Sequence, residues 1–89
     1  MLREEIEIIN KLGMHARAAA KFVTLAQTFK ADIKVARNGQ QVNGKSIMGV
    51  MMLAAAKGTT IELLIDGEDE QQAKEHLCQL INNRFDEDE

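Results

Sequence analysis

Apolar residues recur along these 89 residues at two different spacings, and the switches between them constrain the fold class. Residues 2–9, 32–37 and 60–65 alternate apolar with polar side chains, which is typical of half-buried strands. Residues 16–29, 47–55 and the segment after Asp69 instead place apolar side chains on one helical face. Helical faces that cover one sheet predict a two-layer α+β sandwich whose other sheet face is partly open to solvent.

Turn and capping residues divide the chain between these segments. The pair Asn38-Gly39 predicts a tight hairpin into a short strand that runs through Val42, because both turn positions tolerate a positive φ. Ser46 is predicted to cap the second helix, and Asp69 to cap the last one with Gln72 as its partner. The predicted order is therefore strand, helix, strand, strand, helix, strand, helix.

Each predicted helix has a set of side chains that should be buried. For the first helix they are Ala19, Phe22, Val23, Ala26 and Phe29. For the second they are Ile47, Val50, Met51 and Ala54, with Met48 and Met52 outside the stripe. For the last they are Ala73, Leu77, Leu80 and Ile81. The acidic residues 86–89 are expected to form a frayed tail.

Composition narrows the function classes. We expect a single domain over residues 1–89 with a thin core, because a chain this short leaves much of its surface exposed. The net charge of -3 and the lack of Trp and Tyr argue against a nucleic-acid module. The lone Cys78 cannot form an internal disulfide, and neither a signal peptide nor a membrane-spanning segment is recognised, so we expect a cytoplasmic protein.

The stretch from Leu12 to Ala20 has the residues best suited to chemistry. His15 flanks the first turn of the predicted helix, where unpaired backbone N–H groups and the positive end of the helix dipole favour an anion. The same dipole favours an uncharged ring, which leaves a nitrogen free as a nucleophile, and Arg17 can hold phosphate oxygens in a bidentate fork. His15 could thus accept a phosphoryl group, although a histidine at a helix start is more often an ordinary surface residue.

Two further features have both a functional and a structural interpretation. Phosphate on Ser46 would meet the unpaired amides of the helix it opens, but a serine at this position far more often serves only as a cap. Met48 lies outside the predicted buried stripe and suits a surface that fits several partners. A metal site is not predicted, since His15 and His76 are far apart in sequence and Cys78 cannot share a helical face with His76.

Two motifs resemble those of one known family. Gly13-Met14-His15-Ala16-Arg17 and Lys45-Ser46-Ile47-Met48-Gly49-Val50 look like the active-site and regulatory-serine motifs of HPr, the histidine-containing phosphocarrier of the bacterial phosphotransferase system. The resemblance covers essentially the whole chain. It implies an open-faced sandwich with strand order 1-4-2-3 beneath three helices. It also implies phosphorylation of His15 at Nδ1, assistance by Arg17, and a regulatory serine at Ser46.

The resemblance further implies a monomeric carrier without cofactors rather than a stand-alone enzyme. Enzyme I would phosphorylate the histidine, sugar-specific A-components would take the group, and a kinase/phosphorylase would modify Ser46 in members that have one. The residues expected to dock against these partners are Met14, Ala18, Ile47, Met48 and Met51.

Two observations keep alternatives open. The family commonly has proline directly after the active-site arginine, where this chain has Ala18. The acidic ending Phe85-Asp86-Glu87-Asp88-Glu89 resembles the nitrogen-related paralogue of the same system, which mainly feeds a regulatory branch. A module that binds a regulator without relaying phosphate is a third possibility, although such a module would have no need for the nucleophile at His15.

Overall fold

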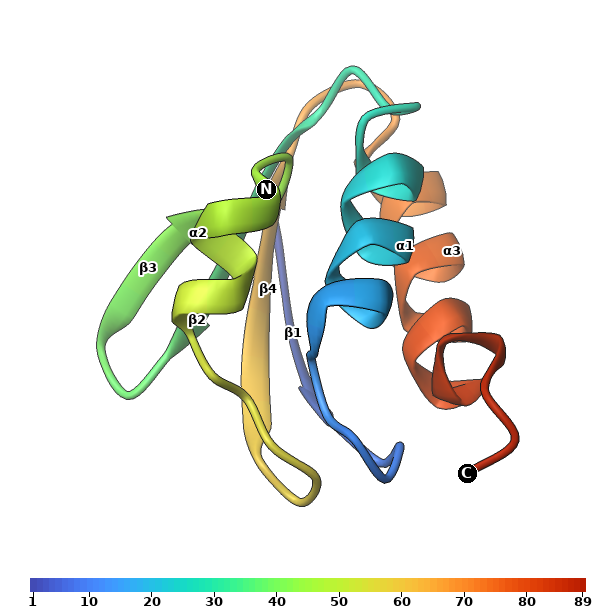
Figure 1. The fold of residues 1–89 in the computed structure, drawn as a ribbon. Coiled ribbons are helices and arrows are strands. Elements are labelled where there is room, and N and C mark those ends of the chain that lie inside the picture. Colours follow the sequence, from blue (N-terminus) through green and yellow to red (C-terminus); the bar gives the residue numbers. More distant parts are fainter.

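Four antiparallel strands form one sheet in the order β1-β4-β2-β3. The computed structural model describes all residues from 1 to 89. The strands are β1 (Leu2–Glu7), β2 (Asp32–Arg37), β3 (Gln40–Asn43) and β4 (Thr60–Asp66), as Figure 1 shows. The strand order and the antiparallel pairing confirm the predicted sheet.

Register aligns the apolar residues of neighbouring strands on one face. Ile6 lies opposite Ile61 in the β1–β4 pair, and Val35 lies opposite Leu63 in the β2–β4 pair. Ile33 joins this face opposite Ile65. Because side chains alternate across a strand, this register places the predicted core residues of β2 and β4 together, and all of them are buried.

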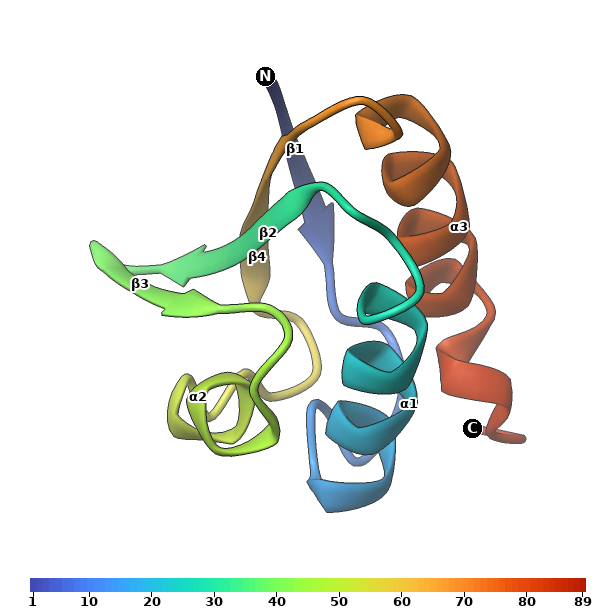
Figure 2. The same ribbon diagram turned by 90° about the horizontal axis from the view of Figure 1, so that it is seen from above.

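Three helices lie on the same side of the sheet (Figure 2): α1 (Ala16–Ala26), α2 (Ile47–Met52) and α3 (Glu70–Asn82). Helix α1 contacts both α2 and α3. Of its predicted face, Ala19, Phe22, Val23 and Ala26 are buried and Phe29 is partly buried beyond the helix end. None of the helices has the length and apolar character needed to cross a bilayer.

The predicted turn and cap around β3 are confirmed. Asn38 and Gly39 have φ values of 51° and 82°, so both adopt the left-handed conformation that a two-residue hairpin requires. Ser46 has extended backbone angles, and its Oγ accepts a hydrogen bond from the Gly49 amide at 3.1 Å. That bond satisfies one of the free amides at the start of α2.

The predicted buried face of the second helix is wrong at three positions. Helix α2 ends at Met52 because Ala54 takes a positive φ of 49°, which breaks the helical path. Ile47 and Met51 are exposed to 43% and 42%, and Ala54 is also exposed. The buried residues of this segment are Val50, Leu53 and Ala55.

Asp69 has a different role from the predicted helix cap. Its side chain makes no cap bond and instead accepts hydrogen bonds from the amides of Lys30 and Ala31, both at 2.9 Å. These amides, Lys30 first, hold the pKa of Asp69 below its usual value despite partial desolvation. Asp69 thus fastens the start of α3 to the loop before β2, a tertiary contact that local spacing does not reveal.

The acidic tail is not frayed, which corrects a second prediction. Arg84, Phe85 and Asp86 form a left-handed turn after α3, with φ values of 56°, 53° and 63°. Such a conformation costs about 1–2 kcal/mol for each non-glycine residue. The buried Phe85 side chain, which is 0% exposed, and a 2.8 Å hydrogen bond from Lys21 Nζ to the Phe85 carbonyl hold the turn in place. Residues 84–89 therefore return towards the start of α1 (Figure 1).

Candidate functional site

His15 is the N-cap residue of α1, as predicted. Its backbone is extended, with φ -75° and ψ 179°, and its side chain makes no capping bond. The preceding loop is fixed by a 2.8 Å hydrogen bond from the Met14 amide to the Ala55 carbonyl. Gly13 adopts φ 67°, and a Cβ there would lie 2.6 Å from the Ala55 oxygen. Glycine is therefore required for the close approach that places His15 at the corner.

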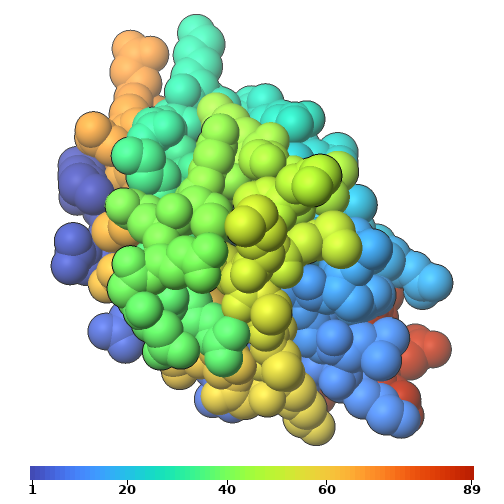
Figure 3. All heavy atoms as spheres, turned by 60° about the vertical axis from the view of Figure 1, so that its left-hand side comes forward, coloured from blue at the N-terminus to red at the C-terminus, as the bar shows by residue number.

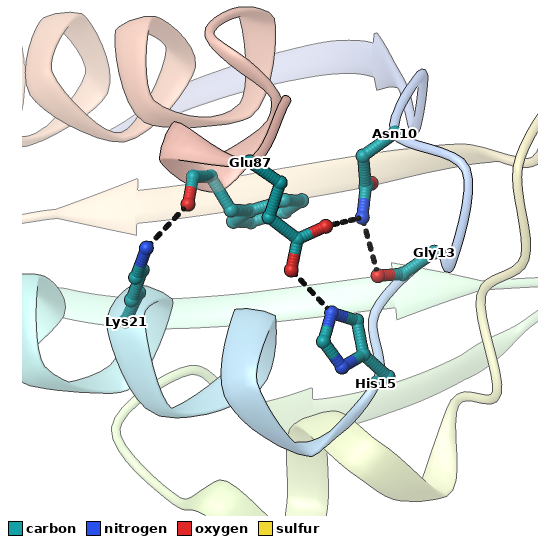
Figure 4. A network of polar contacts seen from close by, with 6 residues as sticks. Asn10, Gly13, His15, Lys21 and Glu87 are labelled. Atoms are coloured by element: carbon teal, nitrogen blue, oxygen red, sulfur yellow. Dashed lines mark hydrogen bonds and ion pairs between the residues drawn. The ribbon is translucent and has the colours of Figure 1, made fainter. Parts of the chain in front are cut away.

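A polar network joins this corner to the C-terminal tail (Figure 4). Asn10 Nδ2 donates to the Gly13 carbonyl at 2.8 Å and to Glu87 Oε1 at 3.0 Å. The other carboxylate oxygen, Glu87 Oε2, pairs with His15 Nε2. Asn10 is fully buried, whereas the His15 side chain remains 26% exposed. One carboxylate thus contacts both the histidine and the residue that supports its loop.

Charge at this corner is predominantly positive on the helix and negative on the tail. Partial burial raises the pKa of Glu87, but hydrogen bonds from Asn10 and His15, together with the charge of Arg17, hold it below its usual value. The Glu87 carboxyl group is therefore ionised at neutral pH. Arg17 is exposed and makes no hydrogen bond or ion pair within the chain. Its guanidinium is free to hold an external anion.

The arrangement leaves one ring nitrogen of His15 available. Nε2 faces Glu87, whereas Nδ1 lies on the side of the ring away from it (Figure 4) and makes no hydrogen bond within the chain. Three components therefore meet at the start of α1: a free nitrogen, a free guanidinium on Arg17, and the amides of the first helical turn. Chemically, this combination suits a nucleophile that receives an anionic group.

Ser46 lies away from His15, near the other end of α1. Gln27 Nε2, just after the last turn of α1, donates to the Lys45 carbonyl at 3.1 Å, which places the start of α2 there. An α1 of 11 residues is about 16 Å long. The two residues that the sequence singled out as anion sites are therefore not brought into contact.

The predicted docking residues separate into exposed and buried ones. Ile47, Met48 and Met51 are exposed to 43%, 74% and 42%. Met14 is only 5% exposed and Ala18 is fully buried, so neither side chain reaches a surface that a partner could touch. The inclusion of these two residues is corrected: both sit where the start of α1 faces the core, and proximity to His15 in sequence did not make them exposed.

Sequence reasoning missed two members of the site, Asn10 and Glu87. The sequence indicated only a loop at Asn10, and it indicated an exposed acidic tail around Glu87. The signal that could have located them is Phe85, because a large aromatic side chain within an acidic tail is more often buried than left in water. Burying it brings the following carboxylates back onto the protein. No group of His, Cys, Asp and Glu side chains in this structure could hold a metal ion.

Comparisons with known proteins agree with this geometry. Residues 2–83 match a family model described as PTS HPr component phosphorylation site. The phosphocarrier protein HPr of Neisseria meningitidis serogroup A is 60% identical over all of both chains, and that of Cupriavidus necator is 57% identical, again over both full chains.

Among solved structures, HPr from Thermoanaerobacter tengcongensis matches with a TM-score of 0.96 and 43% identity, covering 100% of each chain. The match extends over the sheet, the three helices and the tail. The motifs, the strand order and these likenesses together show that the chain belongs to the HPr family, the phosphocarrier proteins of the phosphotransferase system.

Proposed function

We propose that this protein accepts a phosphoryl group on His15 Nδ1 from enzyme I and passes it to the sugar-specific A-components of the phosphotransferase system. The observation that supports this most directly is the position of His15 at the N-cap of α1, with Nδ1 unpaired and Arg17 free beside it. Family membership supports this choice of partners, and the geometry supports His15 as the acceptor.

In the proposed transfer the lone pair of Nδ1 attacks the phosphorus of the phosphohistidine of enzyme I. The bond from phosphorus to the donor nitrogen breaks, and its electron pair returns to that nitrogen. Delivery to an A-component reverses the roles. Such a step needs little covalent machinery, since positioning and electrostatic stabilisation of the phosphoryl oxygens supply most of the catalysis. Arg17 and the first-turn amides of α1 are the groups that would provide it.

An exposed apolar surface runs along α2, from Ser46 towards the loop that precedes His15. We define the docking surface as the exposed apolar side chains of α2 and the loop before His15: Leu12, Ile47, Met48, Met51 and Met52, which are 65%, 43%, 74%, 42% and 65% exposed. Figure 3 shows α2 in yellow-green directly beside the blue segment that leads into α1. Apolar groups exposed together mark interaction sites, and thioethers adapt to several partners.

The direct test is phosphorylation of the intact protein. Incubation with enzyme I and phosphoenolpyruvate should place an acid-labile phosphate on the chain, and a sugar-specific A-component should then remove it. The measurement is radioactive phosphate retained by the protein before and after acid treatment. Absence of label with an enzyme I that phosphorylates another HPr would refute the carrier role and favour a module that binds regulators without relaying phosphate.

We also propose that Ser46 is a regulatory phosphorylation site for a kinase that uses ATP. The new charge would lie roughly 16 Å from His15, the length of α1, whereas charges on a protein surface are screened within about 8 Å at physiological salt. A phosphate on Ser46 would therefore alter the docking surface beside it rather than the reactivity of the His15 ring.

Phosphorylation of Ser46 is expected to slow phosphoryl transfer from enzyme I. The cognate kinase and ATP should add one acid-stable phosphate, which the Ser46→Ala variant does not acquire, and the slower transfer should appear as a higher KM for the carrier. Replacement of the cap should cost the free protein about 1 kcal/mol of stability. Equal transfer rates before and after serine phosphorylation would contradict a regulatory role.

The Ala18→Pro variant should retain phosphoryl acceptance. Ala18 is the third residue of α1, and the first intrahelical bond runs from the Ala19 amide to the His15 carbonyl at 2.8 Å. The Ala18 amide therefore has no helical partner to lose, and proline fixes a φ that the first turn already uses. The unpaired amides of Ala16 and Arg17 remain in the variant to face the phosphoryl group. Transfer rates and thermal unfolding of the two proteins would check this, and loss of transfer would show that the first turn differs from the one described.

A further inference from the structure

We propose that Glu87 is a positioning residue for His15: its carboxylate holds the imidazole proton on Nε2 and so keeps the lone pair on Nδ1. The contact between Glu87 and His15 is present in the unphosphorylated protein, whereas its role in phosphoryl transfer rests on the proposed function. Glu87 Oε2 lies against Nε2, and no other side chain forms a hydrogen bond with the ring.

The chemistry of the two groups determines the tautomer. An ionised carboxylate has no proton to give and can only accept a hydrogen bond. Nε2 must therefore be the donor in its contact with Glu87. A neutral imidazole has a single N–H group, so Nδ1 is left with its lone pair. The nitrogen that the proposed function requires as nucleophile is thus the one that this contact leaves unprotonated.

Asn10 fixes the carboxylate in the orientation that does this. Its Nδ2 lies between two acceptors, the Gly13 carbonyl at 2.8 Å and Glu87 Oε1 at 3.0 Å. An amide turned the other way would place its oxygen against both of them, so Asn10 donates to both. Since Asn10 is fully buried, it holds Glu87 Oε1 in place and directs Oε2 at the histidine.

The contacts of the C-terminal tail, residues 84–89, hold Glu87 in this position. The left-handed turn at residues 84–86 is strained, and the burial of Phe85 and the hydrogen bond from Lys21 maintain it. Beyond Glu87, the Lys11 amide donates to the Glu89 carbonyl at 3.0 Å. Glu87 is therefore held from both sides along the chain, with its side chain only 11% exposed.

The same contact suits the phosphorylated state. When Nδ1 forms its bond to phosphorus and the donor nitrogen recovers the electron pair of the old bond, the proton on Nε2 stays where it is. The ring then has a positive charge, which faces the Glu87 carboxylate. A hydrogen bond between charged groups is stronger than one from a neutral ring, so the contact stabilises the product of the transfer.

The Glu87→Gln variant should invert the tautomer. Because Asn10 remains a donor, the single oxygen of the glutamine side chain must face Asn10, and its NH2 group then faces Nε2. Nε2 becomes an acceptor and the proton moves to Nδ1. Ring nitrogen chemical shifts of His15 in the resting protein, recorded at about pH 9 where imidazole is neutral, should show Nε2–H in the natural protein and Nδ1–H in the variant.

Phosphorylation by enzyme I should fall about tenfold or more in Glu87→Gln, since a wrong tautomer is costly even with the geometry intact. The matched control is Glu89→Gln, which removes one charge from the same tail but loses only an exposed 3.4 Å ion pair with Lys11, and it should transfer at the natural rate. An unchanged tautomer in Glu87→Gln, or equal rates for the two variants, would overturn the proposal. If the natural protein is not phosphorylated at all while the tautomers differ as described, the proposed function fails and the positioning contact stands.

Discussion

The His15→Ala variant is expected to take up no acid-labile phosphate from enzyme I and phosphoenolpyruvate. Alanine has no nucleophile, and the other nitrogen-bearing side chain at the start of α1, the Arg17 guanidinium, stays protonated and has no lone pair to offer. The fold should survive, because the histidine makes no helix-capping bond and is 26% exposed. We expect its free energy of unfolding to change by about 1 kcal/mol or less.

The matched control for this experiment is His76→Ala. His76 is exposed on α3, and its Nδ1 contacts only the Gln72 carbonyl of the same helix, at 2.8 Å. This variant should be labelled as fast as the natural protein. Label that persists in His15→Ala and disappears in His76→Ala would show that His76 is the acceptor, and it would contradict the proposal.

The Phe85→Ala variant is expected to lose about 3 kcal/mol of unfolding free energy, the lower end of the range for a buried aromatic residue because a chain terminus relaxes easily. Phe85 is fully buried, and its burial offsets the strain of the left-handed turn. Without the aromatic ring the tail should detach, so the histidine tautomer should lose the preference that Glu87 imposes. Unfolding in denaturant measures the first effect, and ring nitrogen shifts measure the second.

Phe29→Ala provides the comparison. Phe29 lies just beyond α1 and is only partly buried, packed against the core and the His76 ring. The same substitution there removes an aromatic group without touching the tail, and it should cost less stability and leave the His15 tautomer unchanged. A Phe85→Ala variant that is as stable as Phe29→Ala would mean that the tail is not anchored by its aromatic side chain.

Local patterns were sufficient for the sheet. In β2, the alternation of Ile33 and Val35 with charged neighbours identified the buried face, since side-chain direction in a strand depends only on sequence parity. Asn38-Gly39 identified the hairpin through a conformational preference of those two residues. The site corner at His15 was predictable for the same reason: a glycine followed by helix-forming alanines defines a helix start locally.

Long-range contacts were not predictable in this way. His15 and Glu87 are separated by 72 positions in sequence, and no periodicity connects them. Asp69 was expected to bond with its own helix, but its carboxylate reaches the Lys30 and Ala31 amides instead. For Asp69 a tertiary partner replaces the expected local one, and for His15 the partner lies at the far end of the sequence, so only the packed structure shows either contact.

Short elements were the second source of error. Six residues give α2 fewer than two turns, and the chain leaves the helical path at Ala54, so the segment is too short for a repeating buried stripe. The helical stripe Ile47, Val50 and Met51 was therefore a poor guide to burial. Met14 and Ala18 show the opposite case: both were expected to dock against partners, although the corner turns both side chains into the core.

The separation of His15 and Ser46 by the length of α1 has a consequence for how information could pass through this protein. Because the two phosphorylation sites lie beyond each other's electrostatic range, a partner that contacts only one end of α1 does not sense a phosphate at the other end. A partner whose contact surface spans α1 meets both phosphorylation sites at once. Its affinity can therefore depend on the combination of phosphates on His15 and Ser46. The area that a partner contacts would then determine which phosphorylation states it distinguishes. Helix α1 fixes the distance between the two sites.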